Sequence, residues 1–533
     1  MKILKMGHGE RVRAVVDSPV ITSLRVILED LPLFGGIIGA LASKILALII
    51  HHEPTSYSAL HENGLPQAFL TMISTYIPPS PELILAIPNV FDAICINNQG
   101  KELFAQHNFE GFFRVFSSLE HCKVMTQGHC ASDSGAAIDE VVRHHPDLKD
   151  TLLKSYIQML KDVIGNLVMH EKPVGLRLPE LVDISDSAEA ETEVNIPSTL
   201  NSGSDLILRP VKEERNSPVL LLARNVLLFS EGLFSTAHWV KEFVREDGHK
   251  LLLNILRAPA LPVDYADTRD GVCLRGLISL FAEQFGPNVI PDVLTSTREI
   301  VTKIDVSPVS LPSRYITEEG LADIDLNTLN PYLRLLSPLL SHLSILHSIY
   351  MQTTNMQGRP NPAYTLPFGQ QENVDMLGTL GKIVRDCYSK GNELLRSLPK
   401  KYKDALPLQN TIEDPRRRSQ VNELSDENFL KKYGFPRRSL LFRNIELLQL
   451  FIGLIPRRTQ RFFAGLSNSL VSRSKLSDPN QRNIAVAVLD KISDVFLDLV
   501  SHSSDPSYQP INRFINLFGA LTFTHNTLTG GHS

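Results

Sequence analysis

"HENGLPQAFLTMI" (residues 61–73) joins a polar corner to a run of apolar residues. Gly64 suits a corner that needs a positive φ, and the apolar side chains behind it recur at helical spacing. The same arrangement returns in "QHNFEGFFRVF" (106–116), where Asn108, the next best residue for such a corner, takes the place of glycine. Each stretch therefore predicts a helix, a tight turn and a second helix that packs on the first.

A third stretch, "REDGHKLLLNIL" (245–256), follows the same order and places Gly248 at the corner. From Gly64 to Asn108 is 44 residues, within the period of about 40–47 residues of armadillo and HEAT repeats. In such arrays each helical hairpin covers the apolar faces of its neighbours. The spacing therefore predicts a helical solenoid.

Helix starts and stops are frequent along the chain, whereas alternating β patterns are scarce. Asp478 and Pro479 form a cap and a first helical residue, and one apolar face follows them at Ile484, Val488, Ile492, Val495, Phe496 and Leu499. Asn330 and Pro331 are predicted to start another helix, which Pro338 should kink or split. A break is also expected at Pro146, followed by a new cap at Asp147.

The sequence thus predicts an all-α, armadillo/HEAT-like helical solenoid with disordered acidic and polar inserts. The expected segments are an N-terminal helical block at 1–177, an acidic flexible linker at 178–216, a second helical block at 217–304, a linker at 305–329, a helical block at 330–403, a basic and polar linker at 404–428, and a truncated C-terminal helical block at 429–533.

The composition is that of a globular protein, with 533 residues, 43% hydrophobic and 21% charged. Five cysteines without a CxxC pair favour a reducing compartment, and the polar N-terminus lacks the apolar core of a signal peptide. We therefore expect the nucleus and cytoplasm. The longest apolar stretch, "LFGGIIGALASKILALII" (33–50), carries Lys44, which costs about 3 kcal/mol inside a bilayer, so a solenoid helix is favoured over a membrane span.

Charge is unevenly distributed. Residues 178–208 contain seven acidic residues and no Lys or Arg, among many Ser, Thr and Asn, which predicts a flexible segment. Residues 400–475 hold sixteen Lys and Arg against seven Asp and Glu, an excess of +9. The two segments can attract each other or select different partners.

Cys95 is the first candidate for chemistry, since it lies in the apolar segment "FDAICINN" (91–98). No helix start or basic cluster stands near it in the sequence to lower the pKa of its thiol. A buried packing residue is therefore the preferred interpretation, and a catalytic nucleophile is the alternative.

His121, Cys122, His129 and Cys130 are the sharpest metal candidates, because they offer four zinc-type ligands within ten residues. Adjacent His-Cys pairs suit a tetrahedral site poorly, and their spacing matches no common zinc motif. A loop between helices is preferred here.

Other polar motifs have structural interpretations. His144 and His145 precede Pro146, where cationic side chains suit the end of a helix. The basic runs "PRRRS" (415–419), "PRRS" (436–439) and "PRRTQRFF" (456–463) could bind phosphate-rich ligands or an import receptor, and Ser419 could be a kinase substrate. Solvated loop corners are the preferred interpretation of these runs, and nucleic acid is not expected as a partner.

No Walker loop, GxGxxG, HExxH or GxSxG motif occurs. We therefore assign no catalytic, cofactor-binding or metal-binding residue from the sequence, and expect no cofactor. A helical solenoid more often offers a surface for protein partners than a catalytic pocket.

Four segments in order resemble the N-terminal armadillo-like region of the giant HECT-type E3 ubiquitin ligases, whose animal members carry UBA and WWE domains. They are "HENGLPQAFL" (61–70), "IPNVFDAICINNQGKELFAQHNFEGFFRVF" (87–116), "GAAIDEVVRHHPDLK" (135–149) and "FVREDGHKLLLNILRAPALPVDY" (243–265). The similarity covers about 60–265 well and is looser beyond.

The resemblance implies a scaffold hairpin around Cys95 and a role in ubiquitination and ubiquitin-dependent degradation. No stretch resembles the HECT domain, whose cysteine forms the ubiquitin thioester, so no catalytic residue carries over. The implied protein is a non-catalytic, substrate-binding segment of a larger ligase. Its implied partners are the rest of that ligase, including the HECT domain, and protein substrates such as basic nuclear or ribosomal proteins.

Two alternatives remain open. A free-standing helical-repeat adaptor for transport or assembly would share the same fold without ligase activity. An independent enzyme that uses Cys95 or the His-Cys cluster would instead need an exposed thiol of low pKa.

Overall fold

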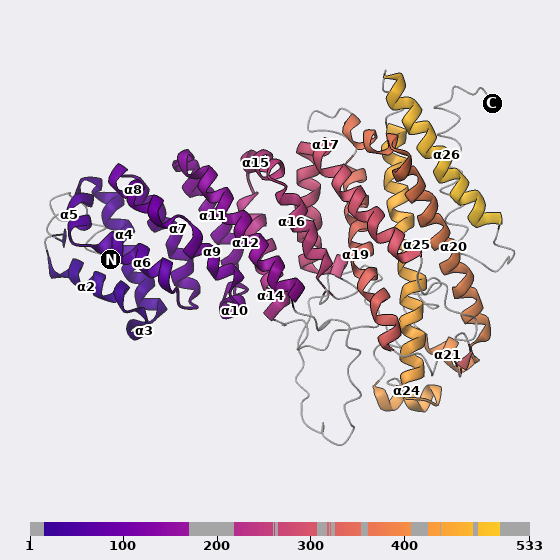
Figure 1. Cartoon of the computed structure of the whole chain (residues 1–533). Coiled ribbons are helices and arrows are strands. Elements are labelled where there is room, and N and C mark those ends of the chain that lie inside the picture. Colours follow the sequence, from indigo (N-terminus) through magenta and orange to yellow (C-terminus); the bar gives the residue numbers. More distant parts are fainter. Residues whose placement is uncertain are drawn as a thin grey trace. The chain divides into compact units, whose positions relative to one another are not determined.

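The computed structural model of the chain consists of helices and their connections (Figure 1). Across the residues it describes there is no strand, which confirms the predicted all-α solenoid class. The described residues are 15–16, 18–169, 218–258, 261, 265–305, 317–318, 320, 326–352, 361–406, 425–436, 439–472 and 478–501.

The helices divide into two compact units, an N-terminal unit from α2 to η5 and a C-terminal unit from η6 to α26. The division falls between residues 260 and 261, inside the segment 217–304 that the sequence presents as one helical block. The acidic stretch 178–208 and most of the expected linkers at 305–329 and 404–428 lie outside the described residues.

The N-terminal unit stacks its longer helices in two rows. One row contains α4 (Gly36–His52), α7 (Pro81–Cys95), α11 (Cys130–His144) and α14 (Pro218–Leu233), each packed against the next. The other contains α2 (Pro19–Glu29), α6 (Leu65–Thr75), α9 (Glu110–Ser117), α12 (Lys149–Met169) and α16 (Gly248–Asn254). Each helix thus buries its apolar side chains against its neighbours, as in a repeat array.

Short helices join the rows. They are α3 (Leu31–Phe34), η2 (Pro54–Ser56), α5 (Tyr57–Glu62), α8 (Asn98–His107), α10 (Cys122–Met125), η3 (Pro146–Leu148), η4 (Ala237–Trp239), α15 (Val240–Arg245) and η5 (Ile255–Arg257). The expected break at Pro146 is present, because α11 ends at His144 and α12 begins at Lys149.

Contacts between neighbouring repeats keep the predicted spacing. The Tyr76 hydroxyl donates to the Glu120 carboxylate at 2.8 Å, and the two residues are 44 apart in sequence. His121 Nε2 lies 2.6 Å from the Ile77 carbonyl oxygen at the same separation of 44. The 44-residue spacing read from Gly64 and Asn108 is therefore a spacing of packed units.

Local capping signals explain where several helices begin. Ser18 Oγ accepts from the Val20 N–H at the start of α2, and Ser80 Oγ accepts from the Leu83 N–H at the start of α7. A proline occupies the first helical position of both helices, where its missing N–H costs no hydrogen bond.

The predicted corners are confirmed at two of three positions. Gly64 has φ 75° and Asn108 has φ 52°. In the third corner Asp247, rather than Gly248, takes the positive φ, at 59°. The prediction for Gly248 is wrong because this glycine serves close packing: a Cβ there would lie 2.1 Å from the Phe243 ring.

A cluster of phenylalanine rings forms the core between α6, α7, α8 and α9. Phe91 makes edge contacts with Phe69, Phe104, Phe109 and Phe112 at centroid distances of 5.0 to 6.2 Å. All five side chains are fully buried. Such pairs stabilise a core by roughly 0.5–1.5 kcal/mol each beyond the burial of their area.

The apolar stretch 33–50 forms most of α4, which packs between α2 and α7. Leu46 and Ile50 are buried, whereas Lys44 is exposed, so the interpretation as a solenoid helix is confirmed. Among the described residues no single helix is long and apolar enough to cross a membrane. One consecutive pair, Gly36–His52 with Pro54–Glu62, reaches that length together but is bent by 113°.

The C-terminal unit is built from longer helices. They are α17 (Arg269–Asp305), α19 (Leu326–Met351), α20 (Gln371–Ser397), α25 (Leu440–Ser472) and α26 (Pro479–Ser501), with η6 (Tyr265–Asp267), η9 (Pro362–Tyr364), η10 (Leu366–Gly369), α21 (Lys400–Ala405) and α24 (Asp426–Tyr433). Helix α19 packs against both α17 and α25, and α20 packs against α17, α25 and α26.

Two helix boundaries in this unit test the sequence patterns. Helix α26 begins at Pro479, and the Asp478 carboxylate accepts from the Asn480 N–H, as predicted. Helix α19 begins at Leu326 and continues through Pro338, so the predicted start at Asn330 is wrong and Pro338 does not split the helix. The residues after Pro338 are almost all buried, and this packing outweighs the lost backbone hydrogen bond.

Candidate functional site

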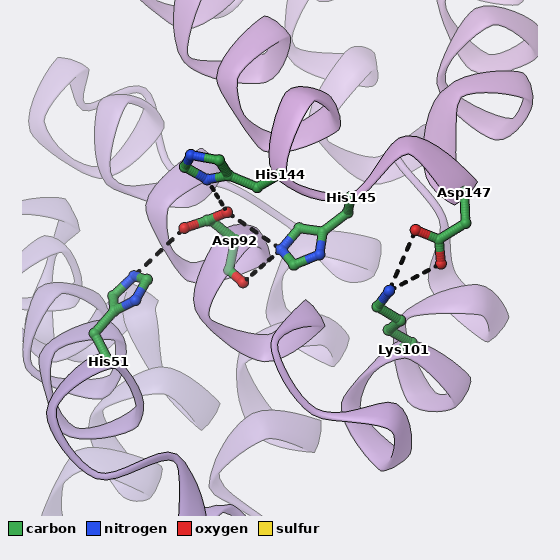
Figure 2. A network of polar contacts seen from close by, with 6 residues as sticks. All are labelled: His51, Asp92, Lys101, His144, His145 and Asp147. Atoms are coloured by element: carbon green, nitrogen blue, oxygen red, sulfur yellow. Dashed lines mark hydrogen bonds and ion pairs between the residues drawn. The ribbon is translucent and has the colours of Figure 1, made fainter.

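Three consecutive helices of one row end around a single carboxylate (Figure 2). Asp92, in the last turn of α7, lies 2.8 Å from His144 Nδ1, 3.2 Å from His145 Nε2 and 3.7 Å from His51 Nε2. His145 Nε2 also lies 3.1 Å from the Asp92 carbonyl oxygen. We call Asp92 and these three histidines the Asp92 cluster.

Helix electrostatics explain why histidines gather here. The carbonyl ends of α4 and α11 carry partial negative charge, which suits the N–H groups of imidazole side chains, and the Asp92 carboxylate offers them hydrogen-bond acceptors. The interpretation of His144 and His145 as residues that end a helix is confirmed, since α11 ends at His144. Their carboxylate partner was missed because it lies 52 residues earlier than His144 in the sequence.

The Asp92 cluster joins repeats and does not form a metal site. Among the described residues its ligand atoms do not gather within 4.8 Å of one another, as coordination to one ion would require. Instead each histidine reaches Asp92 from a different direction (Figure 2). The carboxylate therefore links α4, α7 and α11.

Replacing Asp92 with asparagine should lower the free energy of unfolding of the N-terminal unit by about 1–3 kcal/mol, because hydrogen bonds to a charged group are lost. Urea unfolding can follow Trp239, the chain's single tryptophan, which is buried in this unit. Glu102→Gln, which removes the charge of an exposed carboxylate on α8, should change the stability by less than about 0.5 kcal/mol. Equal effects of both substitutions would show that the Asp92 cluster contributes nothing specific.

A salt bridge lies beside the Asp92 cluster (Figure 2). Lys101 Nζ of α8 lies 3.0 and 3.2 Å from the two carboxylate oxygens of Asp147 in η3. The hydrogen bond from Lys101 holds the pKa of Asp147 below its usual value. Because the Asp147 side chain is 55% exposed, the pair adds little to stability and mainly fixes the position of η3.

His121 and Cys122, two of the four candidate zinc ligands, form hydrogen bonds with neighbouring residues of the helical array. His121 lies 2.6 Å from the Ile77 carbonyl oxygen through Nε2 and 3.0 Å from Ser118 Oγ through Nδ1. Cys122 Sγ donates to the Leu119 carbonyl oxygen at 2.9 Å, and burial raises the pKa of its thiol.

His129 and Cys130 stand at the start of α11. Cys130 is buried, with Sγ 3.9 Å from Met125 Sδ, and burial raises the pKa of its thiol to about 11. Within the described residues, no three of the four candidate zinc ligands come within 4.8 Å of one another. His121, Cys122 and Cys130 are therefore buried in the packing around α10 and α11, whereas His129 is exposed at the start of α11.

Cys95 is fully buried beside the phenylalanine core, one turn beyond Phe91 on α7. Burial raises the pKa of its thiol to about 12, so the thiolate is scarce at neutral pH. The interpretation of Cys95 as a packing residue is confirmed.

Iodoacetamide should distinguish the five thiols in the native protein. Cys273 is partly exposed, whereas Cys95, Cys122, Cys130 and Cys387 are buried. We expect Cys273 to be alkylated first near pH 7.5 and the other four only after unfolding, as followed by peptide mass spectrometry over time. Alkylation of native Cys95 as fast as that of Cys273 would contradict its assignment to the core.

The basic runs have different outcomes. The run 415–419, with Ser419, lies outside the described residues, as do the arginines of 436–439. The run 456–463 lies inside α25 and is not the expected loop corner. The prediction is wrong because Ile455, Phe462 and Phe463 are buried, which keeps this part of the helix packed despite its charges.

Comparison with known proteins shows which proteins the chain resembles. Residues 1–264 match the family described as Domain of Unknown Function (DUF913). The E3 ubiquitin-protein ligase ptr1 of Schizosaccharomyces pombe is 40% identical over 149 residues, which are 28% of this chain and 5% of the ligase.

Two further relatives extend the match. The E3 ubiquitin-protein ligase HUWE1 of Mus musculus is 27% identical over 359 residues, 59% of this chain and 8% of the ligase. The E3 ubiquitin-protein ligase TOM1-like of Neurospora crassa is 20% identical over an alignment of 644 positions, which covers 98% of this chain and 16% of the ligase.

The helical array of the N-terminal unit thus lies in a DUF913 region. The chain is similar to the giant HECT-type E3 ubiquitin-protein ligases, as the sequence resemblance indicated. It matches a partial region of those proteins, and spans between 5% and 16% of the length of these three relatives.

Proposed function

We propose that this chain is a non-catalytic, substrate-binding scaffold of a HECT-type E3 ubiquitin ligase that acts in protein ubiquitination and ubiquitin-dependent degradation. The observation that carries the proposal is the two-row helical array within residues 1–264, the region shared with ligases of this family. A solenoid of this kind offers a long surface to other proteins while its apolar side chains stay buried.

The chemistry of the thiols supports a scaffold role. A HECT-type reaction passes ubiquitin through a cysteine thioester, which needs a reactive, accessible thiolate. The four thiols of Cys95, Cys122, Cys130 and Cys387 have raised pKa values because they are buried. In this proposal the transfer step takes place on a HECT domain, the main partner of this chain.

The acidic stretch 178–208 is proposed to attract substrates. With seven acidic residues and no Lys or Arg, it presents a concentrated negative charge to basic proteins. Basic nuclear and ribosomal proteins are the proposed substrate class, which is consistent with action in the nucleus and cytoplasm. Attraction of this kind acts mainly through the rate of association and weakens with salt.

A charge-neutral variant tests this role without shortening the chain. Replacing the seven carboxylates of 178–208 by the matching amides should weaken binding to core histones at least about tenfold at low salt, with a smaller difference at high salt. Deletion of 178–208 should have the same effect. Unchanged affinity of both variants at low salt would remove the acidic stretch from the proposal.

Sequencing of full-length transcripts tests the assignment to a ligase. We expect the reading frame to continue into a HECT domain. A stop directly after Ser533 in all full-length transcripts would instead favour a free-standing helical-repeat adaptor.

A further inference from the structure

Three arginines and one histidine meet where α17, α19 and α25 pack in the C-terminal unit. Arg275 of α17 and Arg458 of α25 both donate to the Ser344 hydroxyl of α19, at 2.8 and 3.4 Å. Because one oxygen atom accepts both bonds, the two guanidinium groups lie side by side despite their like charge.

Arg461 extends the group along α25, one turn beyond Arg458. Its carbonyl oxygen lies 2.8 Å from His347 Nδ1 of α19. Burial, followed by the charges of Arg458 and Arg461, lowers the pKa of Arg275. Burial and the same arginines also lower the pKa of His347, which leaves its imidazole neutral at physiological pH. We call Arg275, Arg458 and Arg461 the arginine cluster.

The arginine cluster carries more positive charge than the nearby carboxylate can balance. Asp267 forms an ion pair with Arg458, and it is the one carboxylate among the described charges that act on Arg275 or Arg461. Three positive charges thus face one negative charge. A structural ion-pair network usually balances its charges when it is withdrawn from water, because an unpaired buried charge is costly. Solvent can stabilise the charge of Arg461, which is exposed, so the charge that needs an explanation is that of the partly buried Arg275 beside Arg458.

The exposure of the arginines leaves a route for a ligand. Arg458 is 8% exposed and Arg275 is partly buried, whereas Arg461 is exposed. The arginine cluster therefore runs from the interior of the helix packing to the surface. Thr459 follows Arg458 in the sequence, and its buried hydroxyl has no hydrogen-bond partner among the described residues.

We propose that the arginine cluster is a binding site for a phosphate group that carries two negative charges. Such a group would balance the excess charge of Arg275, Arg458 and Arg461 over Asp267. Guanidinium groups suit phosphate because their planar N–H forks donate paired hydrogen bonds to its oxygens. The phosphate is either carried by a phosphorylated peptide or free in solution, and one experiment distinguishes these sources.

Binding should be measured on the full chain by calorimetry and thermal unfolding at constant ionic strength. The probes are inorganic phosphate, inositol hexakisphosphate, and a short phosphoserine peptide with its unphosphorylated form. We expect the phosphate-bearing probes to bind and to raise the melting temperature of the C-terminal unit. Tighter binding of the phosphopeptide than of both free phosphates assigns the site to peptides, and the reverse order assigns it to free phosphates.

Two substitutions test the residues. Arg461→Ala and Arg275→Gln should each weaken phosphate binding at least about tenfold, since a hydrogen bond to a charged group is lost. Because they also relieve repulsion, neither should lower the melting temperature without phosphate. Arg482→Ala, which removes another exposed arginine of the same unit, should bind phosphate as the unchanged protein does.

Two results would overturn the proposal. One is that no phosphate-bearing probe binds at millimolar concentration. The other is that Arg461→Ala and Arg275→Gln bind phosphate as tightly as Arg482→Ala does. Either result would leave the arginine cluster as part of the helix packing alone. Since the measurement uses neither ubiquitin nor a basic protein substrate, its outcome is independent of the ligase scaffold role.

Discussion

Replacing Gly135 with alanine is expected to lower the free energy of unfolding of the N-terminal unit by about 3 kcal/mol or more. Helices α11 and α14 cross at this residue. A Cβ on Gly135 would lie 2.1 Å from the Phe229 carbonyl oxygen, and a Cβ on Gly232 would lie 2.0 Å from the Ser132 carbonyl oxygen. Both obstacles are backbone atoms, so the helices must separate to admit a methyl group.

Gly165→Ala is the matched control on α12, because a Cβ there would meet nothing within 4 Å. Alanine forms helices better than glycine, so the free energy of unfolding of this variant should rise by up to about 1 kcal/mol. Urea unfolding followed by Trp239 fluorescence measures both variants in the same unit. If Gly135→Ala and Gly232→Ala were as stable as Gly165→Ala, the close crossing of α11 and α14 would be wrong.

Replacing Asp139 with alanine is expected to lower the free energy of unfolding of the N-terminal unit by about 3–5 kcal/mol, because it removes one partner of a buried charge network. The Asp139 carboxylate is 1% exposed and accepts from Trp239 Nε1 at 2.5 Å and from Thr236 Oγ1 at 3.0 Å. Arg143 Nε lies 3.2 Å from it, one turn along α11. Without the carboxylate, the buried indole N–H loses its hydrogen-bond acceptor.

Hydrogen exchange of α11 and α14 amides measures this effect without relying on the indole that the substitution disturbs. Asp133→Ala, an exposed carboxylate on the same helix, should cost less than about 1 kcal/mol. Asp139→Asn should lower the stability less than Asp139→Ala and more than Asp133→Ala, since an amide oxygen can still accept a hydrogen bond from Trp239. Equal protection in Asp139→Ala and Asp133→Ala would contradict the proposed role of Asp139.

The sequence predicted features that depend on neighbouring residues. The capping residue Asp478, the corners at Gly64 and Asn108 and the end of α11 at His144 all follow from local hydrogen bonding or from φ. Cys95 was predicted to be buried because apolar residues surround it in the sequence itself.

Contacts between distant residues could not be predicted in this way. Asp92 lies 52 residues from His144, and Trp239 lies 100 residues from Asp139. Neither pair leaves a signal in local periodicity, since each depends on which helices become neighbours. The environment of Arg458 could not be predicted for the same reason. Its run of charges predicts a solvated corner, whereas Arg458 lies inside the helix packing, where it pairs with Asp267 and donates to Ser344.

We propose that this chain holds substrates for ubiquitination, while a HECT domain carries the ubiquitin thioester. The most direct measurement incubates the chain with a ubiquitin-activating enzyme and a ubiquitin-charged E2, then analyses the products with and without a reducing agent. Because four of its five thiols are buried, with raised pKa values, we predict no reducible ubiquitin adduct on the chain. A thioester-linked ubiquitin that disappears when one cysteine is changed to serine would contradict the claim.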